Sequence, residues 1–150
     1  MHLINLIGWS GSGKGYLAEK IIETFGADRV DTIPMDMYYY PHEQFPENLH
    51  VEFEWNKFKN FDTPEALETE LLIKHIEQLR NGQEIQIPEY DFGSNPTGKA
   101  QRKPGKIVKP KDFIILDGLF WLCNPRLREL TDVSIFIELS AVNRMARRMI

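Results

Sequence analysis

The sequence predicts an α/β protein, in which a parallel β-sheet is flanked by helices and carries a small β-hairpin insertion. Short apolar runs typical of buried strands alternate with segments in which apolar residues recur every three or four positions, as on one face of a helix. This alternation is typical of parallel sheets with right-handed crossovers. Glycine-rich or acidic residues directly follow three of the runs, at the strand ends where such sheets bind ligands.

Composition narrows the class of protein. A chain of 150 residues with 42% hydrophobic and 27% charged residues has the size and balance of one globular domain, which we expect to span residues 1–150. The formal net charge of −4 argues against a nucleic-acid or membrane-surface binder, and no apolar run is long enough to span a membrane. Homo-oligomerisation stays open.

Cysteine usage and the N-terminus favour a cytoplasmic protein. Cys123 is the one cysteine, so no internal disulfide can form, as expected in a reducing compartment. It follows the apolar residues 119–122, and we therefore expect a packed thiol rather than a nucleophile. Met1 and His2 lead directly into the first apolar run, which leaves no room for a signal peptide.

The first predicted elements are a strand at Leu3–Ile7 and a helix at Tyr16–Phe25, which Gly26 ends. The loop between them, residues 8–14, matches G-x-x-x-x-G-K, a phosphate-binding loop. Glycines that adopt positive φ let such a loop turn its backbone N–H groups around an anion, which the positive end of the helix also faces. The alternative is a chance Gly/Ser turn. The residues that we expect to bind nucleotide phosphates are Gly8, Ser10, Gly11, Ser12, Gly13, Lys14 and Gly15.

Gly15 departs from the motif. It stands where a Ser or Thr hydroxyl ordinarily ligates Mg²⁺, and it offers no side-chain oxygen. A water molecule can take the vacant ligand position, because Mg²⁺ usually keeps several waters. We therefore expect Lys14 to reach the β- and γ-phosphates as usual but the metal to be bound more weakly.

A second strand is predicted at Val30–Met35 and delivers Asp36 at its end. Residues 36–61 are irregular and rich in aromatic side chains, which suggests a flap or pocket wall, or alternatively a local hydrophobic cluster. Thr63 and Pro64 are a typical helix start, and the apolar residues 67–79 continue that helix to Asn81-Gly82.

Strands at residues 85–92 and 106–108 predict the inserted hairpin, with a polar tip over residues 93–105. We interpret the six cations of this region as a solvated surface, or alternatively as a guide for an anionic nucleotide. They are Lys99, Arg102, Lys103, Lys106, Lys109 and Lys111.

The last predicted elements are a strand at Phe113–Leu116, a strand at Val133–Ile137 and a helix at Asn143–Ile150. Asp117 ends the first of these strands. Because the phosphate loop, Asp36 and Asp117 each follow a strand, we expect them to meet at one edge of the sheet.

Taken in order, these motifs resemble the uridine kinase and phosphoribulokinase group of P-loop kinases, and uridine kinases in particular, over nearly the whole chain. The resemblance rests on the phosphate loop and on five later segments. These are Met35-Asp36-Met37-Tyr38-Tyr39, Asn60-Phe61-Asp62-x-Pro64, Ile87-Pro88-x-Tyr90-Asp91-Phe92, Ile114-Ile115-Leu116-Asp117-Gly118-Leu119 and Arg126-Leu127-Arg128.

The resemblance implies a P-loop NTPase-type fold that transfers the ATP γ-phosphate to the 5′-hydroxyl of uridine or cytidine with Mg²⁺, a reaction of nucleotide salvage. It makes Asp36 the general base and, with Asp117, a metal ligand. It places Arg148 near the transferred phosphate and makes Arg148, like Lys14, a catalytic residue. The residues that it assigns to the nucleoside are Asp36, Tyr39, Asp62, Tyr90 and Asn95.

Each role has a structural alternative. Asp36 and Asp117 could be strand-end residues, Asp62 could cap the helix predicted at Pro64, and Arg148 could lie on a solvated helix face. Tyr39 and Tyr90 could serve core or flap packing alone.

The chain also departs from the family pattern. Besides Gly15, Asp117 replaces a glutamate, and Asn95 stands where uridine kinases have a base-reading histidine, which leaves uridine preference open. The chain stops at Ile150, so we expect the family's arginine-rich lid and last strand to be missing. A nucleotide-binding pseudokinase or regulatory subunit, and a kinase of another acceptor such as a vitamin riboside or sugar phosphate, therefore remain alternatives.

Overall fold

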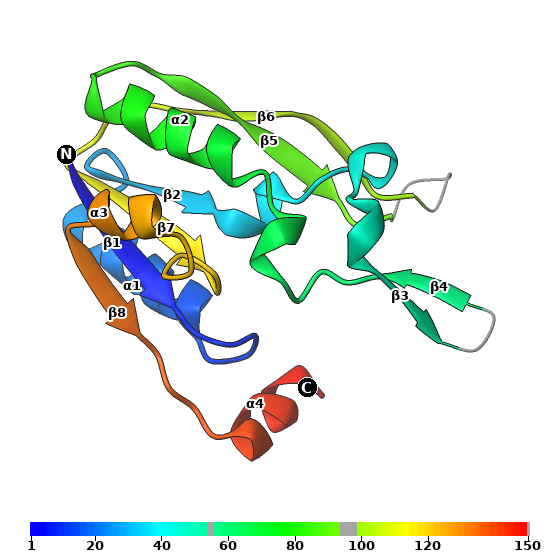
Figure 1. Cartoon of the computed structure of the whole chain (residues 1–150). Coiled ribbons are helices and arrows are strands. Elements are labelled where there is room, and N and C mark those ends of the chain that lie inside the picture. Colours follow the sequence, from blue (N-terminus) through cyan, green and yellow to red (C-terminus); the bar gives the residue numbers. More distant parts are fainter. Residues whose placement is uncertain (54–55, 94–98, 150) are drawn as a thin grey trace. The chain divides into compact units, whose positions relative to one another are not determined.

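The computed structural model describes residues 1–53, 56–93 and 99–149. The chain divides into two compact units, one formed by Met1–Met35 with Lys109–Ile150 and the other by Asp36–Val108. Figure 1 shows their elements. No helix among the described residues is long and apolar enough to cross a membrane.

A four-stranded parallel sheet forms the centre of the first unit, in the order β2-β7-β1-β8. The strands are β1 (His2–Ile7), β2 (Val30–Pro34), β7 (Phe113–Gly118) and β8 (Val133–Phe136). This confirms the predicted α/β class and the position of each strand to within one or two residues. In the register of the sheet, Asp117 lies opposite Leu6 of β1 and Pro34 of β2.

Helix α1 (Lys14–Phe25) packs against this sheet. Its buried Ala18 joins Leu6, Val30 and Ile115 in one apolar core cluster, which explains the helical spacing of apolar residues after the phosphate loop. The helix ends as predicted at Gly26, whose φ of 95° favours glycine and whose N–H donates to the carbonyl oxygen of Ile22.

Two helices complete the first unit, α3 (Pro125–Glu129) and α4 (Ala141–Arg148). The side chain of Asn124 accepts hydrogen bonds from two N–H groups of the first turn of α3, and the side chain of Ser140 caps α4 by accepting from the Asn143 N–H. Helix α3 was not predicted from the sequence. The expectation of a packed Cys123 thiol is wrong, because Cys123 is exposed in the turn before α3.

The second unit contains helix α2 (Thr69–Arg80) and the predicted hairpin, β5 (Ile85–Asp91) paired with β6 (Gln101–Val108). Figure 1 shows α2 running along this hairpin. The helix buries Leu72, Ile73, Ile76 and Leu79, and β5 buries the alternate residues Ile85 and Ile87. The predicted apolar stripe and the strand are thereby confirmed, although β6 begins five residues before the predicted Lys106.

The predicted helix start at Thr63-Pro64 is wrong. Residues 64–66 form a short 3-10 turn, and α2 begins only at Thr69. The reason is tertiary, because the segment after this turn pairs in an extended conformation with residues 38–40. The Glu68 N–H donates to the Tyr38 carbonyl oxygen (2.9 Å), and the Tyr40 N–H donates to that of Ala66 (3.0 Å).

Residues 36–61 are less irregular than predicted. They contain a second hairpin, β3 (His50–Phe53) and β4 (Asn56–Lys59), which pair antiparallel. Three 3-10 turns precede it, at Met35–Tyr38, His42–Gln44 and Glu47–Leu49. The hairpin lacks the Gly- or Asn-based turn signals from which such pairs are predicted.

Candidate functional site

The phosphate-binding loop joins β1 to α1, at the carboxyl end of a central parallel strand. Gly11 has φ 78° and Gly13 has φ 104°, conformations that L side chains rarely adopt. The predicted need for glycine is therefore met at two positions of the motif. Gly13 is also the N-cap of α1 and offers no capping side chain, so the first N–H groups of the helix have no side-chain cap.

Lys14 is the first residue of α1, and its side chain folds back over the loop. Its ammonium group donates to the carbonyl oxygen of Gly8 (2.7 Å) and lies 3.5 Å from that of Trp9. Both partners are neutral, and within the described part of the chain no carboxylate forms an ion pair with Lys14. The lysine therefore holds an uncompensated positive charge at the loop.

Helix α4 packs against this loop through Arg144 and Arg147, two arginines to which no role was assigned from the sequence. The Arg147 guanidinium donates to the carbonyl oxygen of Ser12 (3.2 Å), and the Arg144 guanidinium lies over the Trp9 ring, 5.5 Å from its centroid. Arg148, which the resemblance favoured, lies in the last turn of the same helix. The arginine-rich pattern was visible in the sequence, but the contacts of Arg144 and Arg147 with the loop depend on how α4 packs.

A cavity of about 500 Å³ adjoins the loop. It is lined by Ser12, Gly13, Tyr16, Leu17, Ile137 and Arg147. Except for Arg147 and the loop itself, its lining is largely apolar or aromatic, as is usual in pockets that hold a planar ring. Tyr16 is 68% exposed, so its ring is open to contact with a ligand. This cavity could not be predicted from the sequence, because Ile137 and Tyr16 are distant in the chain.

Asp117 is a carboxylate of the first unit that lies near the loop, since its neighbour in the sheet, Leu6, lies two residues before Gly8. No cluster of three or more His, Cys, Asp or Glu side chains suited to a metal occurs among the described residues. Mg²⁺ in phosphoryl-transfer sites takes one or two carboxylates and completes its shell with phosphates and water. Asp117 fits that donor set, whereas Gly15 supplies nothing to it.

The second unit gathers an aromatic cluster around Tyr39. The Tyr39 ring contacts those of Phe61 (centroid distance 5.2 Å), Tyr90 (5.8 Å) and Phe92 (6.0 Å). Tyr39 also donates its hydroxyl hydrogen bond to the carbonyl oxygen of Phe61 (3.1 Å), and Tyr90 donates to that of Tyr40 (3.1 Å). Both tyrosines are thus buried and hydrogen-bonded, while Phe92 is 58% exposed and gives the cluster an open side.

Two predicted acidic residues belong to the surroundings of this cluster. Burial, and then the negative charges of Asp36 and Asp62, raise the pKa of the Tyr39 hydroxyl well above its usual value. Burial raises the pKa of Tyr90 to about 12. Both hydroxyls therefore stay protonated at neutral pH and act as hydrogen-bond donors. The alternative of α-helix capping by Asp62 is wrong, because no α-helix begins at Pro64.

The predicted residues thus fall into two groups. The phosphate loop, Lys14 and Asp117 belong to the first unit, and Asp36, Tyr39, Asp62 and Tyr90 to the second, in which Asp36 is the first residue. Arg148 belongs to α4 of the first unit. Asn95 lies outside the described residues.

Comparison with known proteins identifies the family. The model of the phosphoribulokinase / uridine kinase family matches residues 3–150, so the chain belongs to this family of P-loop kinases. The uridine kinase of Clostridium perfringens is 36% identical over 147 residues, which cover 98% of this chain and 66% of that protein. The chain thus spans about two thirds of the length of the curated relatives that it matches.

Solved structures agree on the fold. A candidate fructose transport system kinase from Silicibacter sp. TM1040 superposes with a TM-score of 0.75 at 22% identity, covering 97% of this chain and 69% of the other. A candidate uridine kinase from Bacillus stearothermophilus gives a TM-score of 0.66 at 18% identity, covering 97% and 75%. The predicted P-loop type of α/β fold is thereby confirmed.

Proposed function

We propose that this protein transfers the γ-phosphate of ATP to the 5′-hydroxyl of a pyrimidine nucleoside, uridine or cytidine, as a step of nucleotide salvage. The observation that carries the proposal is the phosphate loop, in a chain of the phosphoribulokinase / uridine kinase family. Two of its glycines have the required positive φ, and the ammonium group of Lys14 donates to backbone carbonyl oxygens of the loop. The uridine kinases at 35–37% identity support the choice of acceptor.

At the donor side, the chain binds and orients the phosphates. The N–H groups of the loop and of the first turn of α1 point at the phosphate oxygens, and Lys14 exchanges its two carbonyl partners for the β- and γ-phosphates. Arg147 and Tyr16 border the cavity beside the loop, where the nucleotide base has an apolar surface to lie on. Arg148 stabilises the charge on the transferred phosphate.

At the acceptor side, a carboxylate and two tyrosines act on the nucleoside. Asp36 accepts the proton of the 5′-hydroxyl as its oxygen attacks the γ-phosphorus atom. Asp62 accepts hydrogen bonds from the ribose hydroxyls, and the rings around Tyr39 and Tyr90 contact the nucleoside. Asn95 reads the pyrimidine through its amide.

Mg²⁺ would be held by Asp117 and Asp36, directly or through water. When bound, it neutralises charge on the β- and γ-phosphates. The rest of the catalysis rests on the chain's own groups, which position the reactants and stabilise charge, and these are the main requirements of phosphoryl transfer.

A panel of acceptors tests the proposal. ATP turnover is measured with Mg²⁺ and uridine, cytidine, other ribosides, a sugar phosphate or no acceptor. We expect turnover that depends on uridine or cytidine and that falls at least 100-fold in Asp36→Asn, the order of loss for a missing general base. Turnover that depends on another riboside or on the sugar phosphate would show that the acceptor is not a pyrimidine nucleoside.

A nucleotide-binding protein without transfer activity is the second candidate. It is favoured by Gly15, which removes the usual hydroxyl ligand of the metal. A folded sample that binds ATP but shows no acceptor-dependent turnover would support this candidate over the kinase.

A further inference from the structure

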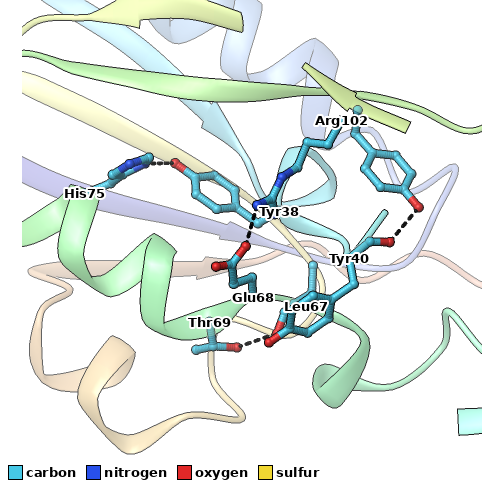
Figure 2. A network of polar contacts seen from close by, with 8 residues as sticks. Tyr38, Tyr40, Leu67, Glu68, Thr69, His75 and Arg102 are labelled. Atoms are coloured by element: carbon cyan, nitrogen blue, oxygen red, sulfur yellow. Dashed lines mark hydrogen bonds and ion pairs between the residues drawn. The ribbon is translucent and has the colours of Figure 1, made fainter. Parts of the chain in front are cut away.

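A polar network in the second unit joins the β5–β6 hairpin to the segment that carries Tyr39 (Figure 2). Its centre is Arg102 of β6, whose guanidinium forms an ion pair with Glu68 at 2.5 Å. Glu68 directly precedes α2. In the hairpin register Arg102 lies opposite Tyr90, whose hydroxyl donates to the carbonyl oxygen of Tyr40. The hairpin therefore contacts the segment 38–40 directly, through the hydrogen bond from Tyr90 to Tyr40. Through Arg102 it also binds Glu68, whose backbone is hydrogen-bonded to the same segment.

Glu68 connects Arg102 to the backbone of residues 38–40. Its N–H donates to the Tyr38 carbonyl oxygen, and the Tyr40 N–H donates to the Ala66 carbonyl oxygen. Between these two hydrogen bonds, Tyr39 forms an isolated antiparallel bridge with Leu67. A third contact comes from α2, where the buried Tyr38 hydroxyl lies 2.9 Å from Nδ1 of His75. The backbone that carries the Tyr39 ring is thus held in place by its pairing with residues 66–68, which includes the hydrogen bond from Glu68 to Tyr38.

Burial distinguishes the Arg102–Glu68 pair from the Lys103–Glu89 pair of the hairpin. The Arg102 side chain is 18% exposed and the Glu68 side chain 30%, whereas Lys103 and Glu89, the next pair along, are 66% and 55% exposed. One guanidinium nitrogen of Arg102, Nη1, is buried and has no hydrogen-bond partner within the described residues. The charge of Arg102 therefore depends on Glu68 for compensation, which makes the pair sensitive to the loss of either member.

We propose that the Arg102–Glu68 pair is a positioning device for the acceptor site: it fixes the extended pairing of residues 38–40 with 66–68 and so holds Tyr39 in the orientation that binds the nucleoside. Neither residue touches substrate; they act through the backbone of Tyr38 and Tyr40. The proposal rests on the proposed function for the identity of the ligand, but the hold on the backbone is a property of the structure alone.

The test uses four variants of the full chain. Arg102→Met and Glu68→Gln each remove the charge pair, and Arg102→Lys keeps the positive charge but replaces the guanidinium by a single ammonium group. Lys103→Met is the matched control, because it removes the neighbouring exposed ion pair from the same strand. Thermal unfolding shows which variants fold; if Arg102→Met does not, Glu68→Gln and Arg102→Lys carry the test.

Two readouts are measured. The first is hydrogen exchange at the Tyr40 and Glu68 amides, which reports the hold on the backbone without any activity. The second is the KM for the acceptor compared with the KM for ATP. We expect Arg102→Met and Glu68→Gln to raise amide exchange and acceptor KM about tenfold and to leave the ATP KM within twofold of wild type. Arg102→Lys should recover most of the loss, and Lys103→Met should match wild type.

Unchanged exchange at both amides in Arg102→Met and Glu68→Gln would overturn the proposal, as would faster exchange with an unchanged acceptor KM. Equal increases in both KM values would also overturn it, since a general loss of structure is not selective. A wild-type protein without acceptor-dependent turnover would refute the proposed function instead, and the exchange data would still decide whether the pair holds the segment.

Discussion

Replacing Gly15 by serine tests whether the hydroxyl missing from the phosphate-loop motif limits Mg²⁺ binding. The structure leaves room for the change. A Cβ atom built at Gly15 meets no heavy atom within 4 Å, and Gly15 lies in the first turn of α1 outside the positive-φ region. Serine can therefore be introduced without strain, and its oxygen stands where the motif places a metal ligand.

The expected magnitudes separate two effects. Glycine is roughly 0.8–1.0 kcal/mol less favourable than alanine inside a helix, and serine lies about halfway between them. Gly15→Ala should therefore raise the free energy of unfolding by up to about 1 kcal/mol, and Gly15→Ser by about 0.5 kcal/mol. One added polar contact to a charged group contributes about 1.5 kcal/mol, which corresponds to roughly a tenfold gain in Mg²⁺ affinity for the serine variant alone.

The assay is ATP turnover with uridine or cytidine as a function of Mg²⁺ concentration, with Gly15→Ala as the control. We expect the Mg²⁺ concentration for half-maximal rate to fall about tenfold in Gly15→Ser and to stay at the wild-type value in Gly15→Ala. Equal responses in the two variants would refute the reasoning, because the missing oxygen would then not limit metal binding.

Three further predictions follow from the same structure. Lys14→Met should lower turnover by at least about 100-fold while leaving the unfolding midpoint nearly unchanged, since its partners are two carbonyl oxygens; turnover near the wild-type value would contradict the role of Lys14. Gly11→Ala should lower the free energy of unfolding by about 1–2 kcal/mol, in contrast to Gly15→Ala. The reason is that Gly11 has φ 78° and that a Cβ atom there lies 3.0 Å from the Arg144 carbonyl oxygen. Denaturant unfolding of both variants measures the difference. Burial, and then the charge of Lys74, lower the pKa of His75 in the folded protein. The unfolded chain therefore binds a proton at His75 more tightly than the folded protein does. As a result, the free energy of unfolding decreases as the pH falls below 6.5, the ordinary pKa of histidine. His75→Gln should therefore reduce the loss of stability between pH 7 and pH 5, and an identical loss in wild type and variant would contradict this.

Local patterns predicted most of the first unit correctly. The run Leu3–Ile7, the glycines after it and the apolar spacing of α1 are encoded within 25 residues, and their packing in Leu6 and Ala18 follows from that spacing. The strand β7 was visible as a continuous apolar run for the same reason.

Tertiary contacts decided the parts that the sequence did not predict. Thr63 and Pro64 have the chemistry of a helix start, but residues 66–68 are held extended by Tyr38 and Tyr40, which are remote in sequence. Similarly, the hydrogen bond from Arg147 to the phosphate loop depends on how α4 packs against that loop, which the sequence of the helix alone does not specify. The Arg102–Glu68 pair joins residues 34 positions apart and could not be recognised from either residue alone.

The most direct measurement is the product of the reaction itself. ATP and Mg²⁺ are incubated with uridine, or with 5′-deoxyuridine, which lacks the acceptor hydroxyl, and both ADP and phosphorylated nucleoside are quantified. The proposed function predicts one nucleoside 5′-monophosphate for each ADP with uridine and neither product with 5′-deoxyuridine. Equal ADP release with both nucleosides, or none with uridine, cytidine or the other acceptors in a folded sample that binds ATP, would contradict it.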